Sequence, residues 1–275
     1  MKKSTLLGAL PIIATLLGQK LGVKVVIGGD RCETDGQVIY LPSLPPDGDP
    51  TLSVLANGYI DHESAHIRYT DFEAGKPDGL TGMIANLLED VRIERRLGER
   101  FPGSRQNLAA LVELLEARKT FVPPAAAPVA VQVGVGLQMM LRARLLGQTS
   151  LTAAADILEA RIDAALPPGV VTKLLALAFE VRNARSTREV IALAQRIVAM
   201  LEEEKTEPAD ADQQGGANQQ GGGGQQGGAN QQGGGGQQDV ADPQGGAGQQ
   251  SAAGQQGGIN QQGSGGQQGS GGQQD

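Results

Sequence analysis

The chain has 275 residues, a formal net charge of −7 and one cysteine. Four of its aspartates lie in the segment 211–275, so the rest is only slightly acidic, and we expect no nucleic acid and no membrane among its partners. A single cysteine excludes an internal disulfide and favours a cytoplasmic protein.

The first 22 residues begin with two lysines, Lys2 and Lys3, followed by an apolar run, as a secretory signal would. However, Pro11 interrupts the run, and no small-x-small cleavage site follows it. We therefore predict a core helix at this end of the chain.

Two short β-rich segments follow at 23–29 and 37–45, with a turn at Asp35 and Gly36 between them. Pro42 restricts the second segment to an edge or a strand end, because proline lacks the N–H group that a ladder needs. An edge strand next to a site would offer free backbone groups to an extended peptide.

A long helical pattern begins at Asp49, the expected N-cap, with Pro50 at the first helical position. A second helix is predicted from Leu80 to Leu97, where Gly98 can end it. Further apolar periodic segments predict helices at 104–121, 127–147, 149–165, 168–182 and 186–204.

These elements predict a mainly helical α+β fold in three parts. Residues 1–122 form a metal-binding domain with a small sheet, and 123–207 extend the same folded unit with helices. The segment 208–275 contains no lysine, arginine or aromatic residue and repeats QQGGANQQGGGG at 213–224 and 225–236. Because such a sequence buries too little apolar surface to offset the entropy of ordering it, we expect a disordered Gln/Gly-rich low-complexity tail.

Both histidines of the chain lie in one motif, HESAH. On a helix, His62 and His66 are about one turn apart, so their rings can bind one metal ion, at about 2.0–2.1 Å for zinc. Glu63 lies beside the ion, where it can take a proton from a metal-activated water that attacks a peptide carbonyl. The motif therefore predicts a zinc-dependent peptidase.

A simpler interpretation of the two histidines stays open. They continue the stripe formed by Leu52, Leu55 and Tyr59, so they can also be ordinary buried residues that hydrogen-bond to carbonyl groups. A metal site is favoured, because two histidines placed at random are rarely four residues apart with a glutamate after the first.

A zinc site needs a third ligand, which must be a carboxylate or Cys32 because no histidine is left. Glu89 and Asp90 are the candidates on the next helix. We choose Glu89, because two histidines and a glutamate commonly complete this motif and because small residues on the same face would let two helices approach. Asp90 is then the expected acceptor of a proton from a ligand imidazole, with the two roles exchanged as the main alternative.

Two further interpretations concern the same helix. Glu89 can instead form an exposed i,i+3 pair with Arg92, and the strongest apolar stripe of the helix faces away from it. Tyr69 and Arg92 are candidates for polarising a substrate carbonyl.

The segments HESAHIRYTDF and NLLEDVRIERR, preceded by GQVIYLPSLP, resemble the N-terminal metallopeptidase-like region of the CobT-type subunit of aerobic cobaltochelatase. The resemblance covers about residues 1–205. It implies a gluzincin-like, and so zincin-like, fold in which His62, His66 and Glu89 bind zinc and Glu63 is the base.

Members of that family usually continue through a low-complexity linker into a von Willebrand factor A domain, which binds a divalent ion and an AAA+ ATPase partner. The D-x-S-x-S motif of that domain does not occur in the sequence. We therefore expect this domain to be missing, and we do not expect the chain to insert cobalt into a corrin.

The sequence thus predicts a zinc-dependent metallopeptidase-like protein with one zinc ion per chain and a peptide or protein substrate. The alternative is a non-catalytic CobT-like accessory subunit of cobalamin biosynthesis, which binds metal and partner proteins such as an AAA+ ATPase. A second alternative is a helical protein that binds no metal.

Overall fold

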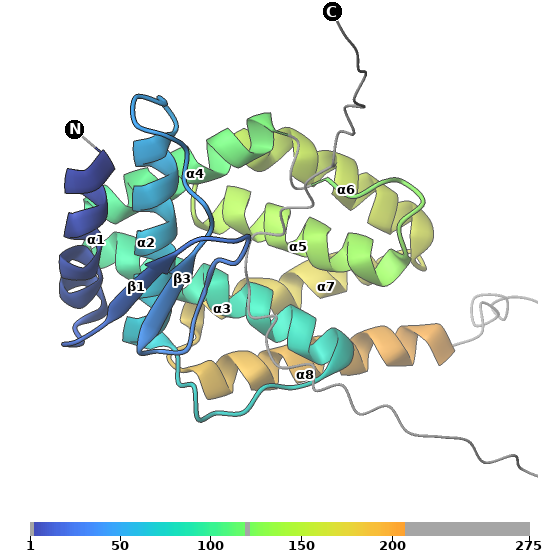
Figure 1. The fold of residues 1–275 in the computed structure, drawn as a ribbon. Coiled ribbons are helices and arrows are strands. Elements are labelled where there is room, and N and C mark those ends of the chain that lie inside the picture. The colour runs from blue at the N-terminus through green and yellow to red at the C-terminus, as the bar shows by residue number, and fades with distance from the viewer. Residues whose placement is uncertain (1–2, 119–121, 207–275) are drawn as a thin grey trace, which may run out of the picture. The chain divides into compact units, whose positions relative to one another are not determined.

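The computed structural model describes residues 3–118 and 122–206, and its first element is helix α1, Lys3–Gly18 (Figure 1). One face of α1 is buried with a helical period, through Leu6, Leu10 and Ala14. Among the described residues, no helix is long and apolar enough to cross a membrane.

A three-stranded sheet follows, with β1 Lys24–Ile27, β2 Glu33–Thr34 and β3 Val38–Leu41 in the order β1-β3-β2. β3 pairs in parallel with β1 and antiparallel with β2, so the second predicted strand is the central one. Pro42 follows its last residue, where no ladder hydrogen bond is needed. The sequence did not predict β2, because two residues are too few to form a periodic pattern.

The rest of the described chain is mainly helical, with α2 Leu52–Tyr69, α3 Gly79–Arg100, α4 Pro102–Ala117, α5 Val129–Leu145, α6 Thr152–Ala165, α7 Val170–Ala178 and α8 Thr187–Thr206. Two short 3-10 helices, Thr149–Leu151 and Phe179–Asn183, precede α6 and follow α7. Each predicted helical segment therefore contains a helix.

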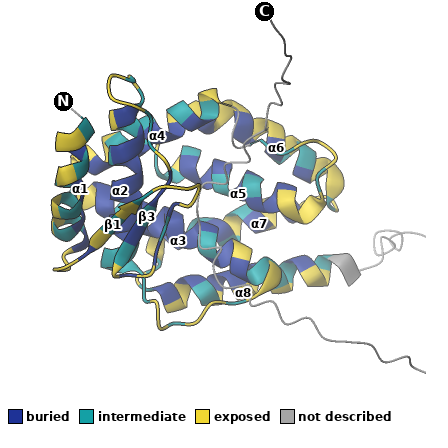
Figure 2. Ribbon diagram, in the orientation of Figure 1, coloured by how far each residue is buried: buried dark blue, intermediate teal, exposed yellow. Residues whose placement is uncertain are grey.

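Helix α2 begins three residues after its predicted N-cap. Asp49 closes a turn instead, because its Oδ1 accepts hydrogen bonds from the backbone N–H and the hydroxyl of Thr51 at 2.7 and 2.6 Å. From Gly58 to Ala65 every residue of α2 is buried, since α1, the sheet, α3 and α4 pack around it (Figure 2). The middle of this helix therefore holds its polar side chains away from solvent.

Helix α3 continues to Arg100, so the prediction that Gly98 ends it is wrong. Gly98 is buried, and a Cβ atom there would lie 3.1 Å from the Cβ atom of Arg105, so this glycine allows the close approach of α4. The helix ends next to Pro102, because a proline disfavours helical backbone in the residue before it.

Two large apolar clusters stabilise the fold. One joins α1, the sheet, α2 and α4, and the other joins α3 with the helices from α5 to α8. Helices α2 and α3 also pack against each other, and each carries a run of buried polar side chains, which comprises Asp61, His62, Glu63, Ser64, Glu89, Asp90, Arg92 and Glu94.

The prediction of a mainly helical α+β fold is confirmed. The zincin-like arrangement and the boundary at residue 122 stay predictions. The predicted tail, 208–275, lies outside the described residues.

Candidate metal centre

The two histidines lie one turn apart on α2, and their Nε2 atoms lie near Asp90 of α3. The ring centroids are 5.0 Å apart, and the Nε2–Oδ1 distances to Asp90 are 4.0 Å for His62 and 3.3 Å for His66. These three ligand atoms all lie within 4.8 Å of one another. Donor atoms around a tetrahedral zinc ion are about 3.3 Å apart, so a small closure of this group would suit one ion.

Asp90, and not Glu89, is the carboxylate that α3 brings to the histidines. Arg92 donates to both oxygens of Glu89, at 2.6 and 2.7 Å. The hydroxyl groups of Thr70 and Thr187 also donate to Glu89 Oε1, each at 2.9 Å. Glu89 thus forms the i,i+3 pair with Arg92 that the sequence offered as its alternative, but the pair is buried rather than exposed.

Glu94, one turn after Asp90 on α3, orients His62. Its Oε1 lies 2.9 Å from His62 Nδ1, and Arg142 of α5 donates to both of its oxygens at 2.7 and 2.8 Å. Burial raises the pKa of Glu94, but the charge of Arg142 and the hydrogen bond with His62 outweigh this effect and lower it to about 2. An ionised Glu94 can only accept, so His62 Nδ1 donates and Nε2 is the nitrogen left for a metal.

The protonation of His62 depends on the same carboxylate. Burial lowers the pKa of His62, but the hydrogen bond to Glu94 and the charges of Asp90 and Glu63 raise it to about 9. Without metal, His62 Nε2 therefore holds a proton, which a metal ion must displace in order to bind there.

Thr70 plays the corresponding part for His66. Its Oγ1 lies 3.0 Å from His66 Nδ1 and donates its one hydrogen to Glu89. The hydroxyl must therefore accept from His66 Nδ1, which leaves Nε2 with its lone pair toward Asp90. Both histidines thus present Nε2 to the same point.

Two of the candidate ligand atoms, His62 Nε2 and Asp90 Oδ1, are buried and have no hydrogen-bond partner among the described residues. An unsatisfied buried polar atom is unfavourable by about 1–3 kcal/mol. The nearest arginines already pair with Glu89 and Glu94, and in the described chain Glu63 has no arginine or lysine in ion-pair contact. A divalent cation at this point would bind His62 Nε2 and Asp90 Oδ1 and would balance the negative charge of Asp90 and Glu63.

Glu63 is buried beside His62, and the thiol of Cys32 donates a hydrogen bond to its Oε1 at 3.1 Å. Burial raises the pKa of Glu63, although the charges of His62 and His66 oppose this effect. Burial and the neighbouring Glu63 also raise the pKa of the Cys32 thiol well above its usual value. In the metal-free protein Cys32 is therefore a neutral donor.

The two residues predicted to polarise a substrate carbonyl are engaged within the protein. Arg92 is paired with Glu89 and donates to the carbonyl oxygen of Tyr69 at 2.7 Å. The Tyr69 hydroxyl lies 3.4 Å from the carbonyl oxygen of Arg96. Neither residue is part of the group of three candidate ligands.

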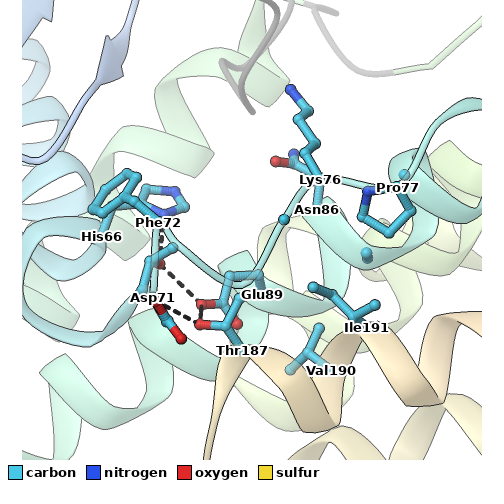
Figure 3. A pocket seen from close by; sticks show the side chains of 14 residues that line it. His66, Asp71, Phe72, Lys76, Pro77, Asn86, Glu89, Thr187, Val190 and Ile191 are labelled. Atoms are coloured by element: carbon cyan, nitrogen blue, oxygen red, sulfur yellow. Dashed lines mark hydrogen bonds between the residues drawn. The ribbon is translucent and has the colours of Figure 1, made fainter.

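A cavity of about 110 Å³ adjoins the site on the side of His66, between the α2–α3 loop, α3 and α8 (Figure 3). Gly82, Ala85 and Asn86, the small residues predicted to let two helices meet, line this cavity together with Glu89. The face of α3 that carries Glu89 therefore opens onto a cavity, while the neighbouring face carries Asp90 toward α2.

Sequence reasoning missed several residues that support the site. Glu94 could have been found from its place one turn after Asp90, and Thr70 from its place one turn after His66. No local signal pointed to Arg142 or Thr187, because they reach the site from α5 and α8, far along the chain.

A family model described as "Cobalamin biosynthesis protein CobT" matches residues 4–275. No curated protein and no solved structure matches the chain. The family match agrees with the resemblance read from the two helix motifs, and it carries no information on peptide cleavage.

Proposed function

The chain belongs to the CobT family of cobalamin biosynthesis proteins, and from this premise we propose that residues 3–206 are the metal-binding part of a cobaltochelatase subunit. CobT is a cobaltochelatase subunit and works with partner subunits. In this proposal one zinc ion is held by His62, His66 and Asp90, with Asp90 in place of the glutamate predicted from the sequence.

The observation that carries the proposal is the pair of buried, unpartnered atoms, His62 Nε2 and Asp90 Oδ1, directed at the same point as His66 Nε2. Two imidazoles and a carboxylate are a common zinc ligand set. A protein without a cation here would leave these atoms unsatisfied in its interior, so a bound ion is the simplest way to stabilise them.

The residues around the ligands favour the same assignment. Glu94 accepts from the Nδ1 atom of His62, and Thr70 accepts from that of His66, so each ring is fixed with Nε2 available. Carboxylates and hydroxyls in these positions orient ligand histidines and raise their basicity.

Peptide hydrolysis is the second candidate function. It is favoured by Glu63, which is buried beside His62 in the position of a proton acceptor. A zinc ion in this site would supply Lewis acidity toward a carbonyl oxygen. Against this function, the Cys32 thiol already donates to Glu63 Oε1, so one acceptor site of the carboxylate is occupied on that oxygen.

The metal content of purified full-length protein tests the proposal. We expect one zinc ion per wild-type chain and less than a tenth of that in His62→Ala. A wild-type protein that binds no divalent metal would refute the proposed metal centre.

A screen for peptide cleavage, run on wild type and on Glu63→Gln, separates the two candidate functions. Absence of cleavage in a zinc-loaded wild type supports the subunit role. Cleavage that disappears in Glu63→Gln while zinc remains bound would support the peptidase.

The partners are part of the same proposal. We propose that the chain assembles with an AAA+ ATPase subunit of cobaltochelatase, because CobT proteins work with partner subunits. The test is size-exclusion chromatography of the two proteins mixed with ATP. Elution as one complex is expected, and separate elution at micromolar concentration would contradict it.

A further inference from the structure

Folding gathers the only two histidines and the only cysteine of the chain around one point. Cys32 lies just before the edge strand β2, 30 positions ahead of His62 in the sequence. Its buried thiol nevertheless contacts Glu63, the neighbour of His62, at 3.1 Å. The three side chains that bind zinc best are thus brought together from separate elements.

The thiol makes the hydrogen bond that a group completing the coordination of an ion would make. Three ligands leave one place open on a tetrahedral ion, and a carboxylate such as Glu63 would ordinarily hold the molecule in that place by a hydrogen bond. Here Cys32 Sγ makes that hydrogen bond. The unpartnered His62 Nε2 and Asp90 Oδ1 independently indicate that a cation belongs beside it.

We propose that Cys32 is the fourth ligand, so that His62, His66, Asp90 and Cys32 form a closed, structural metal site. This inference rests on the proposed metal centre and goes beyond it, because it assigns the place that a catalytic centre would keep open for water.

Coordination by Cys32 requires one proton transfer and a small movement. The S–H bond breaks, a sulfur–metal bond forms, and the proton passes to Glu63 Oε1, which already accepts that hydrogen bond. A divalent ion deprotonates a coordinating thiol even where burial favours the neutral form. Since Cys32 does not belong to the group of atoms within 4.8 Å of one another, its sulfur must rotate from Glu63 toward the ion.

Cobalt(II) in place of zinc gives a direct spectroscopic test, because a thiolate ligand produces a ligand-to-metal charge-transfer band in the near ultraviolet. The chain contains a single cysteine, so such a band can arise only from Cys32. We expect the full-length wild type, loaded with one cobalt per chain, to show this band. One bound cobalt without the band would overturn the inference and leave the three-ligand centre intact.

The variant Cys32→Ser sharpens the test. It should still bind cobalt, lose the charge-transfer band and bind zinc about 100-fold more weakly, because one of four ligands has gone. Unchanged zinc affinity would contradict the proposal. His62→Ala is the control that should lose the cobalt spectrum altogether.

One bound cobalt without the charge-transfer band removes the fourth ligand alone and leaves the proposed function standing. If wild type binds no divalent metal, the metal centre and the fourth ligand fail together. If Cys32→Ser does not fold, the wild-type cobalt spectrum decides by itself, since it requires no variant.

Discussion

The two neighbouring carboxylates of α3, Glu89 and Asp90, lie in opposite environments. Glu89 faces the cavity beside α8 and has its charge balanced by Arg92 and its oxygens filled by four hydrogen bonds. Asp90 faces α2, and its Oδ1 has no hydrogen-bond partner, while its Oδ2 is 3.9 Å from an arginine that is already paired. A candidate ligand is therefore recognised by its unsatisfied atoms rather than by its residue type.

Removal of Arg142 should have the largest effect, because Glu94 would lose the buried guanidinium that pairs with both of its oxygens and keep only His62 as a charged partner. We expect Arg142→Ala to lower the free energy of unfolding by about 3–5 kcal/mol, measured by urea denaturation of the metal-free protein. Arg144→Ala on the same helix is the matched control, since Arg144 is partly exposed and should change stability by less than about 1 kcal/mol. Equal effects of the two variants would show that Glu94 is not held as a buried ion.

Loss of the carboxylate behind His62 should weaken metal binding without removing a ligand. We expect Glu94→Gln to lower zinc affinity about 10–100-fold, measured by competition with a chromophoric chelator. Glu99→Gln, at an exposed position of the same helix, should leave the affinity unchanged. A Glu94→Gln protein with wild-type affinity would mean that Glu94 serves packing alone.

As pH rises, the stability of the metal-free protein should fall, while its affinity for zinc should rise. The pKa of His62 is raised from 6.5 to about 9, so its contribution to stability is present below pH 6.5 and is lost as pH rises through 9. Zinc affinity should rise over the same window, up to tenfold per pH unit, because the ion displaces the proton. Urea denaturation with a chelator measures the stability at pH 6.5 and 9, and zinc titrations measure the affinity at the same two pH values. A stability and an affinity that change in the same direction would contradict the assignment of Nε2 as the metal-binding nitrogen.

The support of His66 is a neutral hydroxyl, so its loss should have the smallest effect. We expect Thr70→Val to lower zinc affinity about tenfold, less than Glu94→Gln. Thr172→Val, at an exposed position of α7, is the control. A larger loss of zinc affinity in Thr70→Val than in Glu94→Gln would mean that the Thr70 hydroxyl contributes more to metal binding than the Glu94 carboxylate, which would contradict this order.

The sequence predicted the helical part of the fold and the placing of the two histidines one turn apart on a helix, because both depend on residues that are neighbours along one helix. It predicted the His62 and His66 pair from their spacing and placed Glu63 beside them. It chose Glu89 over Asp90 as the third ligand, but the residue that lies next to the histidines depends on how α3 is rotated against α2, which no local pattern gives. That rotation is set by distant partners such as Arg142 and Thr187.

The most direct test of the account is the zinc content of two full-length variants, Asp90→Asn and Glu89→Gln, with folding checked by circular dichroism. We predict that Asp90→Asn loses zinc, whereas Glu89→Gln keeps close to one zinc ion per chain, because its carboxylate is bound to Arg92 and not to the metal. Loss of zinc in Glu89→Gln together with its retention in Asp90→Asn would contradict the proposed site.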